Sequence, residues 1–323
     1  MSCANCGKTE EEGNALKACV ACKMVKYCNR ECQIAHRPQH KRECKKRAAE
    51  LHDEKLFKQL PPYQQHEKLF KEPPPLEDCP ICMIQLPNHP PGRAYMNCCG
   101  QDLCTGCIHE FQSKLTRKKD DVCPLCRTPP PQSSAETIKR YEQRMELNDP
   151  LAVRELGSFY NQGKLGLIQN HAKALELWYR AAELGHAQAY YDIGCAYRDG
   201  INGVEVDMKK ARQYTEMAAI RGYLDARYDL GCFEGQAGSM EKNTGKIDRA
   251  LKHWMIAVKG GDRNSLEGIQ KLYRVGLATK DDYAKALRSY QSYQDQIRSD
   301  HRDEAAAFHN IPYLHSGHNP RAR

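Results

Sequence analysis

Apolar positions in the second half of the chain repeat with a long period. The pairs Leu156-Gly157, Ile193-Gly194 and Leu230-Gly231 follow one another every 37 residues, and Ile269-Gln270 follows after a further 39. Self-similarity at this period is typical of stacked helical hairpins. A single hairpin cannot bury its apolar face alone, whereas stacked neighbours bury a continuous core. The pattern therefore predicts antiparallel helix pairs.

Small residues in each repeat indicate where its helices touch. A glycine in the middle of a helix costs about 1 kcal/mol relative to alanine, so its recurrence at one phase predicts close approach of the second helix. Other glycines follow the second helix, where they favour a C-terminal cap; these are Gly185, Gly222 and Gly261. Large side chains are expected to fill the remaining spaces, namely Trp178, Trp254 and Tyr290.

Residues 148–298 closely resemble about four Sel-1-like repeats, which are relatives of tetratricopeptide repeats. The resemblance includes a Lys-Ala or Arg-Ala step in each second helix. It implies an α-solenoid that scaffolds complexes with other proteins.

Cysteine is concentrated in the first part of the chain, where fifteen of the 17 cysteines lie within 126 residues. The N-terminus MSCANCGKTEEEG has no apolar stretch that could serve as a secretory signal, and no run approaches the roughly 18–20 apolar residues of a membrane helix. We therefore expect an intracellular protein of the cytoplasm or nucleus with no membrane partner. Clustered cysteines in that reducing environment favour zinc over disulfides. The two distant cysteines, Cys195 and Cys232, follow repeat glycines and are expected to pack in the core.

Eight potential ligands in residues 1–47 predict two tetrahedral zinc sites. In order they are Cys3, Cys6, Cys19, Cys22, Cys28, Cys32, His40 and Cys44. The segment is too short to fold on its own apolar core, so zinc is expected to supply the folding free energy. His36 is the alternative ligand to His40. We favour His40, because only three residues separate His36 from the ligand Cys32.

Residues 3–44 resemble a MYND zinc finger, including the steps Tyr27-Cys28 and Cys32-Gln33. The resemblance implies interleaved ligand pairs, with one zinc on Cys3, Cys6, Cys28 and Cys32 and the other on Cys19, Cys22, His40 and Cys44. It also implies binding of short proline-rich peptides, with Gln33 at a contact position. Arg37 replaces the tryptophan common in that family, so a purely structural finger is the alternative.

A second cysteine-rich segment, residues 79–127, opens with Cys79-Pro80-Ile81-Cys82 and closes with Cys123-Pro124-Leu125-Cys126-Arg127. It resembles a RING-type finger in an all-cysteine variant. The cross-braced family pattern implies one zinc on Cys79, Cys82, Cys104 and Cys107 and another on Cys98, Cys99, Cys123 and Cys126. Because Cys98 and Cys99 are adjacent, an alternative register would align Cys99-Gly100-Gln101 with the family's Cys-Gly-His step, but glutamine is a poor zinc ligand. His109 is expected on the helix after Cys107 rather than on zinc.

The RING resemblance also implies a groove that binds a ubiquitin-conjugating enzyme and holds its thioester-linked ubiquitin in a reactive pose. The groove residues would be Ile81, Phe111, Pro124 and Leu125, and Arg127 would donate hydrogen bonds to both the enzyme and ubiquitin. Such catalysis works by positioning, so no residue is assigned as a catalytic nucleophile.

The remaining segments are expected to connect these modules. Residues 48–78 predict a proline-punctuated spacer with short helical pieces, in which Glu54-Lys55-Leu56-Phe57-Lys58 recurs as Glu67-Lys68-Leu69-Phe70-Lys71. Each copy runs into prolines, which end a helix, and a docking motif for a partner is the alternative reading of the duplication. Residues 128–147 predict a linker helix and residues 299–323 a polar tail.

The net charge of +8 counts cysteine as neutral. Fifteen thiolates and four zinc ions would lower it to about +1, which argues against nucleic acid as a partner. The expected fold is mainly α, with two small cross-braced zinc modules followed by an α-solenoid. Closed four-ligand sites leave no position for a zinc-bound water, which argues against a metallohydrolase. We expect a RING-type ubiquitin ligase that recruits substrate through the solenoid and MYND finger, with a non-enzymatic adaptor as the alternative and a chromatin or nucleic-acid binder as the weakest reading.

Overall fold

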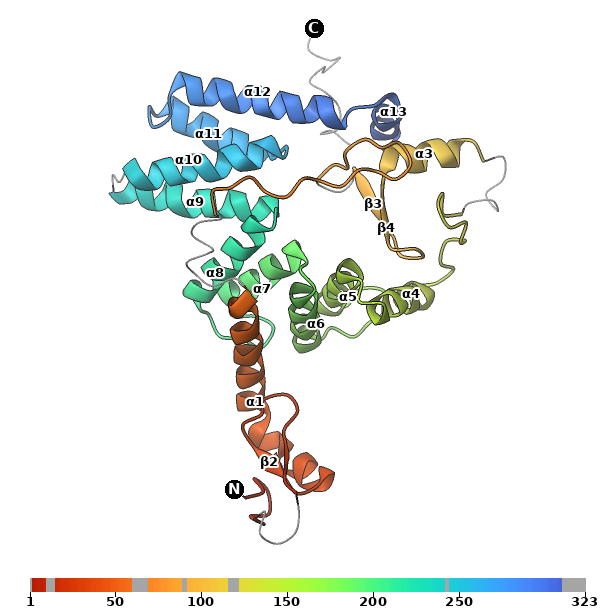
Figure 1. The fold of residues 1–323 in the computed structure, drawn as a ribbon, viewed down its shortest axis with the longest axis vertical. Coiled ribbons are helices and arrows are strands. Elements are labelled where there is room, and N and C mark those ends of the chain that lie inside the picture. The colour runs from red at the N-terminus through yellow and green to blue at the C-terminus, as the bar shows by residue number, and fades with distance from the viewer. Residues whose placement is uncertain are drawn as a thin grey trace.

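Helices make up most of the chain in the computed structural model, which describes residues 2–9, 15–59, 69–88, 92–115, 122–241 and 244–309. Figure 1 shows one long helix, α1, projecting from a curved stack of helix pairs. In chain order the elements are β1 (Lys17–Ala18), β2 (Lys26–Tyr27), α1 (Arg30–Gln59), β3 (Arg93–Met96), β4 (Gln101–Cys104), α3 (Thr105–Ser113), α4 (Ser134–Glu146), α5 (Pro150–Gln162), α6 (His171–Glu183), α7 (Ala187–Asp199), α8 (Met208–Ile220), α9 (Leu224–Glu241), α10 (Thr244–Lys259), α11 (Arg263–Arg274), α12 (Lys280–Ile297) and α13 (Asp300–Phe308).

The repeats fold as the predicted solenoid of helix pairs, α5–α6, α7–α8, α9–α10 and α11–α12. Side chains cap the helices where the sequence changes from loop to apolar repeat: Asp149 and Asp207 accept hydrogen bonds from backbone N–H groups of α5 and α8. Gly185 and Gly222 follow α6 and α8 with φ of 92° and 94°, a conformation that favours glycine. No helix in the described ranges is both long and apolar enough to cross a membrane.

The recurrent mid-helix glycines lie where the paired helices come closest. A Cβ added to Gly157 would lie 2.8 Å from the indole of Trp178, and one added to Gly194 would lie 3.2 Å from the carbonyl oxygen of Ala211. At Gly231 an added Cβ would overlap the indole of Trp254. The glycine pattern therefore had the physical cause that the sequence indicated, and the two tryptophans fill equivalent spaces.

Among the residues that the structure describes, neither Cys195 nor Cys232 belongs to a group of potential metal ligands. Cys232 packs against the apolar cluster around Trp254, and Cys195 is half-buried on α7. Burial raises the pKa of Cys195 to about 11, so this thiol is a poor nucleophile at neutral pH.

The spacer contains more helix than its composition predicted. Helix α1 continues from the finger through the expected boundary at residue 47 and ends at Gln59. The Leu-Phe pair of each copy of the duplicated motif packs on the solenoid. Leu56 is fully buried, with Phe57 5.2 Å from Tyr214 between ring centroids, and Leu69 is 2% exposed, with Phe70 4.8 Å from His253. The duplicated motif was also considered as a docking motif for a partner, and in the structure its Leu-Phe pairs dock on the chain's own solenoid. Residues 60–68, which include Pro61-Pro62 and Glu67-Lys68, lie outside the described residues.

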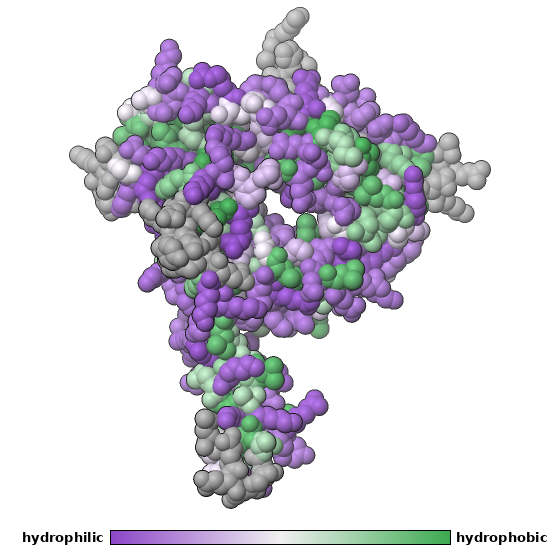
Figure 2. Space-filling model, viewed as in Figure 1, coloured by the Kyte–Doolittle hydropathy of each residue, from purple (hydrophilic) through white to green (hydrophobic). Residues whose placement is uncertain are grey.

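The second cysteine-rich segment lies between the two ends of the solenoid. At the first end, the hydroxyl of Tyr95 in β3 donates to Asp149, the N-cap of α5, at 2.6 Å. At the other end, the backbone N–H of Asn88 donates to the hydroxyl of Tyr293 in α12 at 3.0 Å, and its side chain donates to the carbonyl oxygen of Gly260 at 2.8 Å. The solenoid and this segment therefore close into a ring (Figure 1), and Figure 2 shows an opening near the middle of the molecule.

The segment expected to be a polar tail begins instead with helix α13, which packs along α3. Arg302, Ala305 and Ala306 of α13 are buried. A Cβ on Gly106 of α3 would lie 2.8 Å from Arg302, so the two helices approach closely at that glycine. The expectation failed because Arg302 is buried by contacts with residues more than 200 positions earlier in the sequence. Residues 310–323 lie outside the described part of the chain.

We predict that Gly231→Ala lowers the free energy of unfolding of the solenoid by about 1–3 kcal/mol, because the added methyl group overpacks the Trp254 contact. Gly235→Ala in the same helix is the matched control, since its Cβ would make an ordinary contact of 3.4 Å. That control should be neutral or more stable by up to about 1 kcal/mol. Both tryptophans of the chain lie in the solenoid, so urea unfolding followed by tryptophan fluorescence reports on this part. Equal effects of the two substitutions would contradict the close-packing account.

Candidate metal centres

Sixteen side chains from the two cysteine-rich segments meet in four separate groups. Within each group, the candidate ligand atoms lie within 4.8 Å of one another. The groups are Cys3, Cys6, Cys28 and Cys32; Cys19, Cys22, His40 and Cys44; Cys79, Cys82, Cys104 and Cys107; and Cys98, Cys99, Cys123 and Cys126. Their composition is that expected from the interleaved family patterns.

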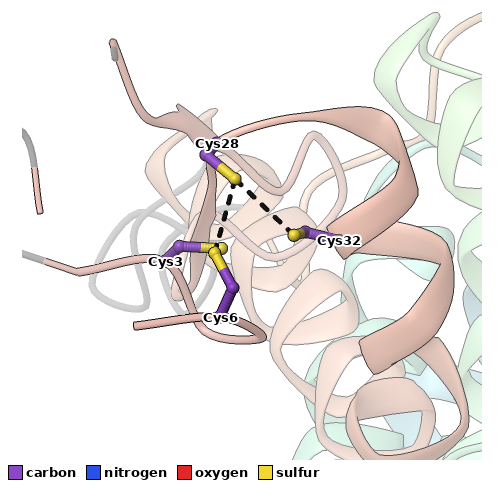
Figure 3. A group of neighbouring side chains, drawn as sticks. All are labelled: Cys3, Cys6, Cys28 and Cys32. Carbon is purple, nitrogen blue, oxygen red and sulfur yellow. Dashed lines mark hydrogen bonds between the residues drawn. The ribbon is translucent and has the colours of Figure 1, made fainter. Parts of the chain in front are cut away.

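The sulfur–sulfur distances suit a tetrahedral zinc ion. A Zn–S bond of about 2.3 Å gives a tetrahedron edge of about 3.8 Å. In the first group, the Cys28 sulfur lies 3.6 Å from that of Cys6 and 3.5 Å from that of Cys32 (Figure 3). In the third group, Cys79 and Cys107 are 3.9 Å apart, as are Cys82 and Cys104. Each group could therefore hold one zinc ion.

Four of the Cys-x-x-Cys pairs share one backbone geometry, while the fifth, Cys104 and Cys107, lies where β4 runs into α3. The residue after the second cysteine has a positive φ, and its N–H donates to the carbonyl oxygen of the first cysteine. The residues in this position are Gly7, Lys23, Met83 and Arg127, with φ of 77°, 58°, 54° and 61°. A left-handed conformation is costly for residues other than glycine, so its recurrence supports one function for all four turns. The turn also aims both sulfur atoms to one side, as chelation requires.

The second group contains His40 rather than His36. The Nε2 atom of His40 lies 3.1 Å from the Cys22 sulfur, and His40 is 7% exposed. The Nδ1 atom of His36 is instead 3.0 Å from the hydroxyl of Tyr27. Both histidines lie on α1, which also carries Cys32 and Cys44, so the start of this helix supplies ligands to both groups of the finger.

The fourth group contains both adjacent cysteines, Cys98 and Cys99. The Cys98 sulfur lies 3.4 Å from that of Cys126, and the Cys99 sulfur lies 3.9 Å from that of Cys123. Gln101, the residue of the alternative register, begins β4 and pairs with Met96. His109 lies on α3 as expected, and its ring contacts Phe308 of α13 at 4.8 Å between centroids.

Within a group, the pKa values of the thiols are shifted in opposite directions by hydrogen bonds and burial. In the first group, a hydrogen bond from the backbone N–H of Cys6 lowers the pKa of Cys3 to about 6, whereas the hydrogen bond with Cys32 raises the pKa of Cys28 to about 12. In the fourth group, burial opposes ionisation of Cys126, but hydrogen bonds with Thr128 lower its pKa to about 6; burial raises that of Cys99 to about 11. Neighbouring thiolates repel one another, and a divalent cation removes that repulsion by binding all of them.

Arg302 of α13 approaches the third group from outside. Its side chain is buried, and its Nη2 atom lies 3.7 Å from the sulfur of Cys82. The same guanidinium donates to the carbonyl oxygens of Ile84 and Gln85 at 3.1 and 2.7 Å. Four thiolates around a divalent ion keep a net negative charge, so this cation would offset part of it. Sequence reasoning missed Arg302, since it lies in a run of charged residues that looks solvent-exposed.

The residues expected to contact a ubiquitin-conjugating enzyme come from the first Cys-x-x-Cys turn, from α3 and from the last Cys-x-x-Cys turn of the second segment. The guanidinium carbon of Arg127 lies 5.0 Å from the ring centroid of Phe111 in α3, so these two residues are brought together. Ile81 and Leu125 are 42% and 37% exposed, and Pro124 is half-buried. Gln33, the expected peptide contact of the first finger, is exposed on α1.

The chain is similar to several solved bacterial structures. A Sel1 repeat protein from Oxalobacter formigenes has 26% identity, with 59% of this chain and 70% of that chain covered and a TM-score of 0.42. The protective antigen c5321, present in uropathogenic Escherichia coli strains and displaying an SLR fold, has 19% identity, 58% and 46% coverage and a TM-score of 0.32. Immunity protein Pa5087 from Pseudomonas aeruginosa has 18% identity, 60% and 80% coverage and a TM-score of 0.29. No curated protein matches the chain.

Two family models match parts of the sequence. The MYND finger model matches residues 3–44, and the Sel1 repeat model matches residues 150–186, 187–223 and 224–262. These matches include neither residues 79–127 nor the fourth helix pair, α11–α12. A RING-type assignment for the second cysteine-rich segment therefore stays a prediction. The chain contains a MYND finger at residues 3–44 and Sel1 repeats at residues 150–262.

Proposed function

We propose that this protein is a zinc-stabilised scaffold that binds other proteins through its solenoid and its MYND finger. The observation that carries the proposal is the docking of the duplicated Leu-Phe motif on successive repeats. Leu56 and Leu69 are both buried against the solenoid, the first fully and the second at 2% exposure. The repeats therefore provide a surface on which apolar side chains of a neighbouring segment bind.

The four cysteine-rich groups have a structural part in this proposal. We infer that the sixteen residues bind four zinc ions, one in each group. Four protein ligands complete the tetrahedral shell of zinc, which leaves no position for a water or substrate. The zinc ions would hold the backbone of two segments that have few apolar residues of their own.

The MYND finger is placed to make a second contact with a partner. It lies at the far end of α1, away from the solenoid (Figure 1). Its exposed apolar side chains include Val20, Met24 and Ile34, and Gln33 is exposed on the same helix as Ile34. Apolar and amide side chains that face solvent are suited to binding an extended peptide.

A RING-type ubiquitin ligase is the second candidate function. It is favoured by the contact of Arg127 with Phe111 and by the exposure of Ile81 and Leu125. In this role the second segment would bind a ubiquitin-conjugating enzyme, while the solenoid and finger would bring substrate to it. The chemistry would be positioning of a reactive thioester, so none of this chain's thiols would act as a nucleophile.

The scaffold proposal predicts that the finger binds at least one peptide from a library of proline-rich sequences. Gln33→Ala should weaken that binding by about fivefold or more, the loss of roughly one hydrogen bond. Gln39→Ala is the matched control, because Gln39 is also exposed on α1 but lies outside the expected contact. Fluorescence anisotropy with the full chain measures both. Absence of any binding peptide, or equal losses in the two variants, would contradict a peptide contact at Gln33.

The ligase candidate predicts ubiquitin chains when the purified protein is incubated with activating enzyme, ubiquitin and a panel of conjugating enzymes. Ile81→Ala and Arg127→Ala should each lower the rate by about tenfold or more. Met83→Ala is the control, since Met83 is 71% exposed next to the third metal group but lies outside the expected groove. If no enzyme of the panel yields chains, the adaptor without enzymatic activity is the correct description.

A further inference from the structure

The last two turns of α1 present one buried carboxylate to the solenoid. Asp53 is 3% exposed. Its Oδ1 atom accepts hydrogen bonds from the hydroxyls of Tyr179 and Tyr214 at 2.8 and 2.5 Å. Its Oδ2 atom accepts from the hydroxyl of Tyr197 at 2.7 Å and from the ammonium of Lys210 at 2.7 Å. These donors come from the helices α6, α7 and α8.

This set of donors is suited to an ionised carboxylate. A buried charge is tolerated only when hydrogen bonds and an opposite charge replace its hydration, and here four donors do so. Burial raises the pKa of Tyr179 and Tyr214, and the charge of Asp53 raises both further. The hydroxyls therefore stay protonated and remain donors. Lys210 also lies 4.9 Å from the ring centroid of Tyr197, a contact that orients its ammonium.

The residues around Asp53 define the shape of the helix that fits. Ala49 and Leu56 are buried at 7% and 0% exposure, and with Asp53 they form one stripe at spacings of four and three residues. Beside the stripe, Glu183 of α6 lies 3.0 Å from His52 and 2.5 Å from Lys55. The groove thus selects an acidic residue within an apolar stripe, with basic residues along one edge.

The next repeat contacts the second copy of the motif through residues at related positions. His253, which faces Phe70, follows Tyr214, which faces Phe57, by 39 residues. Arg249, whose guanidinium lies 5.2 Å from the Phe70 ring centroid, follows Lys210 by the same 39 residues. The equivalent residues Tyr214 and His253 thus face the equivalent phenylalanines of the two copies. The basic residues differ in their contacts, since Lys210 binds Asp53 and Arg249 lies over the Phe70 ring. Recognition of a Leu-Phe pair is a repeated property of this solenoid face.

We propose that the groove formed by α6, α7 and α8 is a binding site for a partner protein's helix that carries an acidic residue three positions before a Leu-Phe pair. In this chain α1 occupies the groove in cis, and the partner helix replaces it in trans. The inference rests on the proposed scaffold function and deepens it, because it names the chemistry of a partner. Its failure would leave the peptide contact of the finger untouched, so the two tests are independent.

A partner helix must compete with α1 for the groove. Because α1 belongs to the same chain, its effective concentration at the groove is on the order of millimolar or higher. A partner helix must therefore be present at a higher concentration than this, or bind the groove more tightly than α1 does. Weakening the Asp53 contact should make the groove available. Asp53→Asn does this with little change in shape, since it removes the charge and keeps an acceptor oxygen.

The test uses a labelled peptide with the sequence of residues 45–59, KKRAAELHDEKLFKQ, and the full zinc-loaded chain. Fluorescence anisotropy should show at least about tenfold tighter binding to the Asp53→Asn chain than to the wild type. Adding Lys210→Met to that chain should weaken binding about tenfold or more, and so should replacing the peptide's own aspartate by asparagine. Equal binding of the two peptides, or no loss with Lys210→Met, would overturn the proposal.

Two further measurements use the wild-type chain and do not depend on the folding of the variants. If Asp53→Asn does not fold, deuterium uptake by α1 of the wild-type chain is measured at high peptide concentration. The aspartate peptide should raise that uptake and the asparagine peptide should not; no rise with either would overturn the proposal. Light scattering of the wild-type chain should show a monomer. A dimer that exchanges α1 between copies would assign the groove to a second copy and overturn its assignment to a partner.

Discussion

The ring of helices depends on the short cysteine-rich segment that joins its two ends. Among the described residues of 79–127, the buried apolar cluster consists of Leu86, Leu103 and three cysteines, with Cys82, Met96 and Ile108 packed against it. The backbone of this segment is therefore held by its two four-cysteine groups. Within each group, the closest pairs of sulfur atoms lie 3.4–3.9 Å apart. From that framework, Tyr95 bonds to the first end of the solenoid and Asn88 to the last. Binding of metal would thus stabilise contacts between helices that are far apart in the sequence.

The solenoid contributes a different kind of order, which comes from repetition. Glycine at one phase of α5, α7 and α9 allows close packing against the second helix of each pair, and Trp178 and Trp254 fill equivalent spaces. Because the helix pairs are alike, their exposed faces are alike too, and each presents a similar set of positions to a neighbouring segment. The duplicated Leu-Phe motif uses this similarity, with one copy on Tyr214 and the other on His253. A scaffold that binds several short segments in line follows from the same property.

The sequence was most informative where the chemistry is local. Ligand spacing predicted two zinc sites in each cysteine-rich segment, because a Cys-x-x-Cys turn or an i, i+4 pair defines its own geometry. The division of the sixteen residues into four groups was implied by the resemblance to MYND and RING fingers, and the structure brings the same groups together. Glycine phase and helix-ending glycines likewise predicted the helix pairs, because each reflects contacts within one repeat.

The contacts that the sequence did not reveal are those between distant residues. Nothing in the run Asp300–Phe308 distinguishes Arg302 from its charged neighbours, yet it is buried against Ile84 and Gln85. Asp53 similarly lies among charged residues of α1, and its three tyrosine partners are more than 120 positions away. Burial of a polar residue depends on what the fold brings to it, and neither composition nor spacing records that.

The central claim is that metal in the second segment holds the two ends of the solenoid together. Hydrogen–deuterium exchange of α13 tests it most directly, in Cys79→Ala and in Cys3→Ala as the control. Both cysteines are almost fully buried and open a Cys-x-x-Cys turn, but Cys3 belongs to the finger at the far end of α1. The account predicts that Cys79→Ala speeds exchange in α13 by about tenfold or more, while Cys3→Ala leaves it unchanged. Unaltered exchange of α13 in Cys79→Ala, or equal acceleration in both variants, would contradict it.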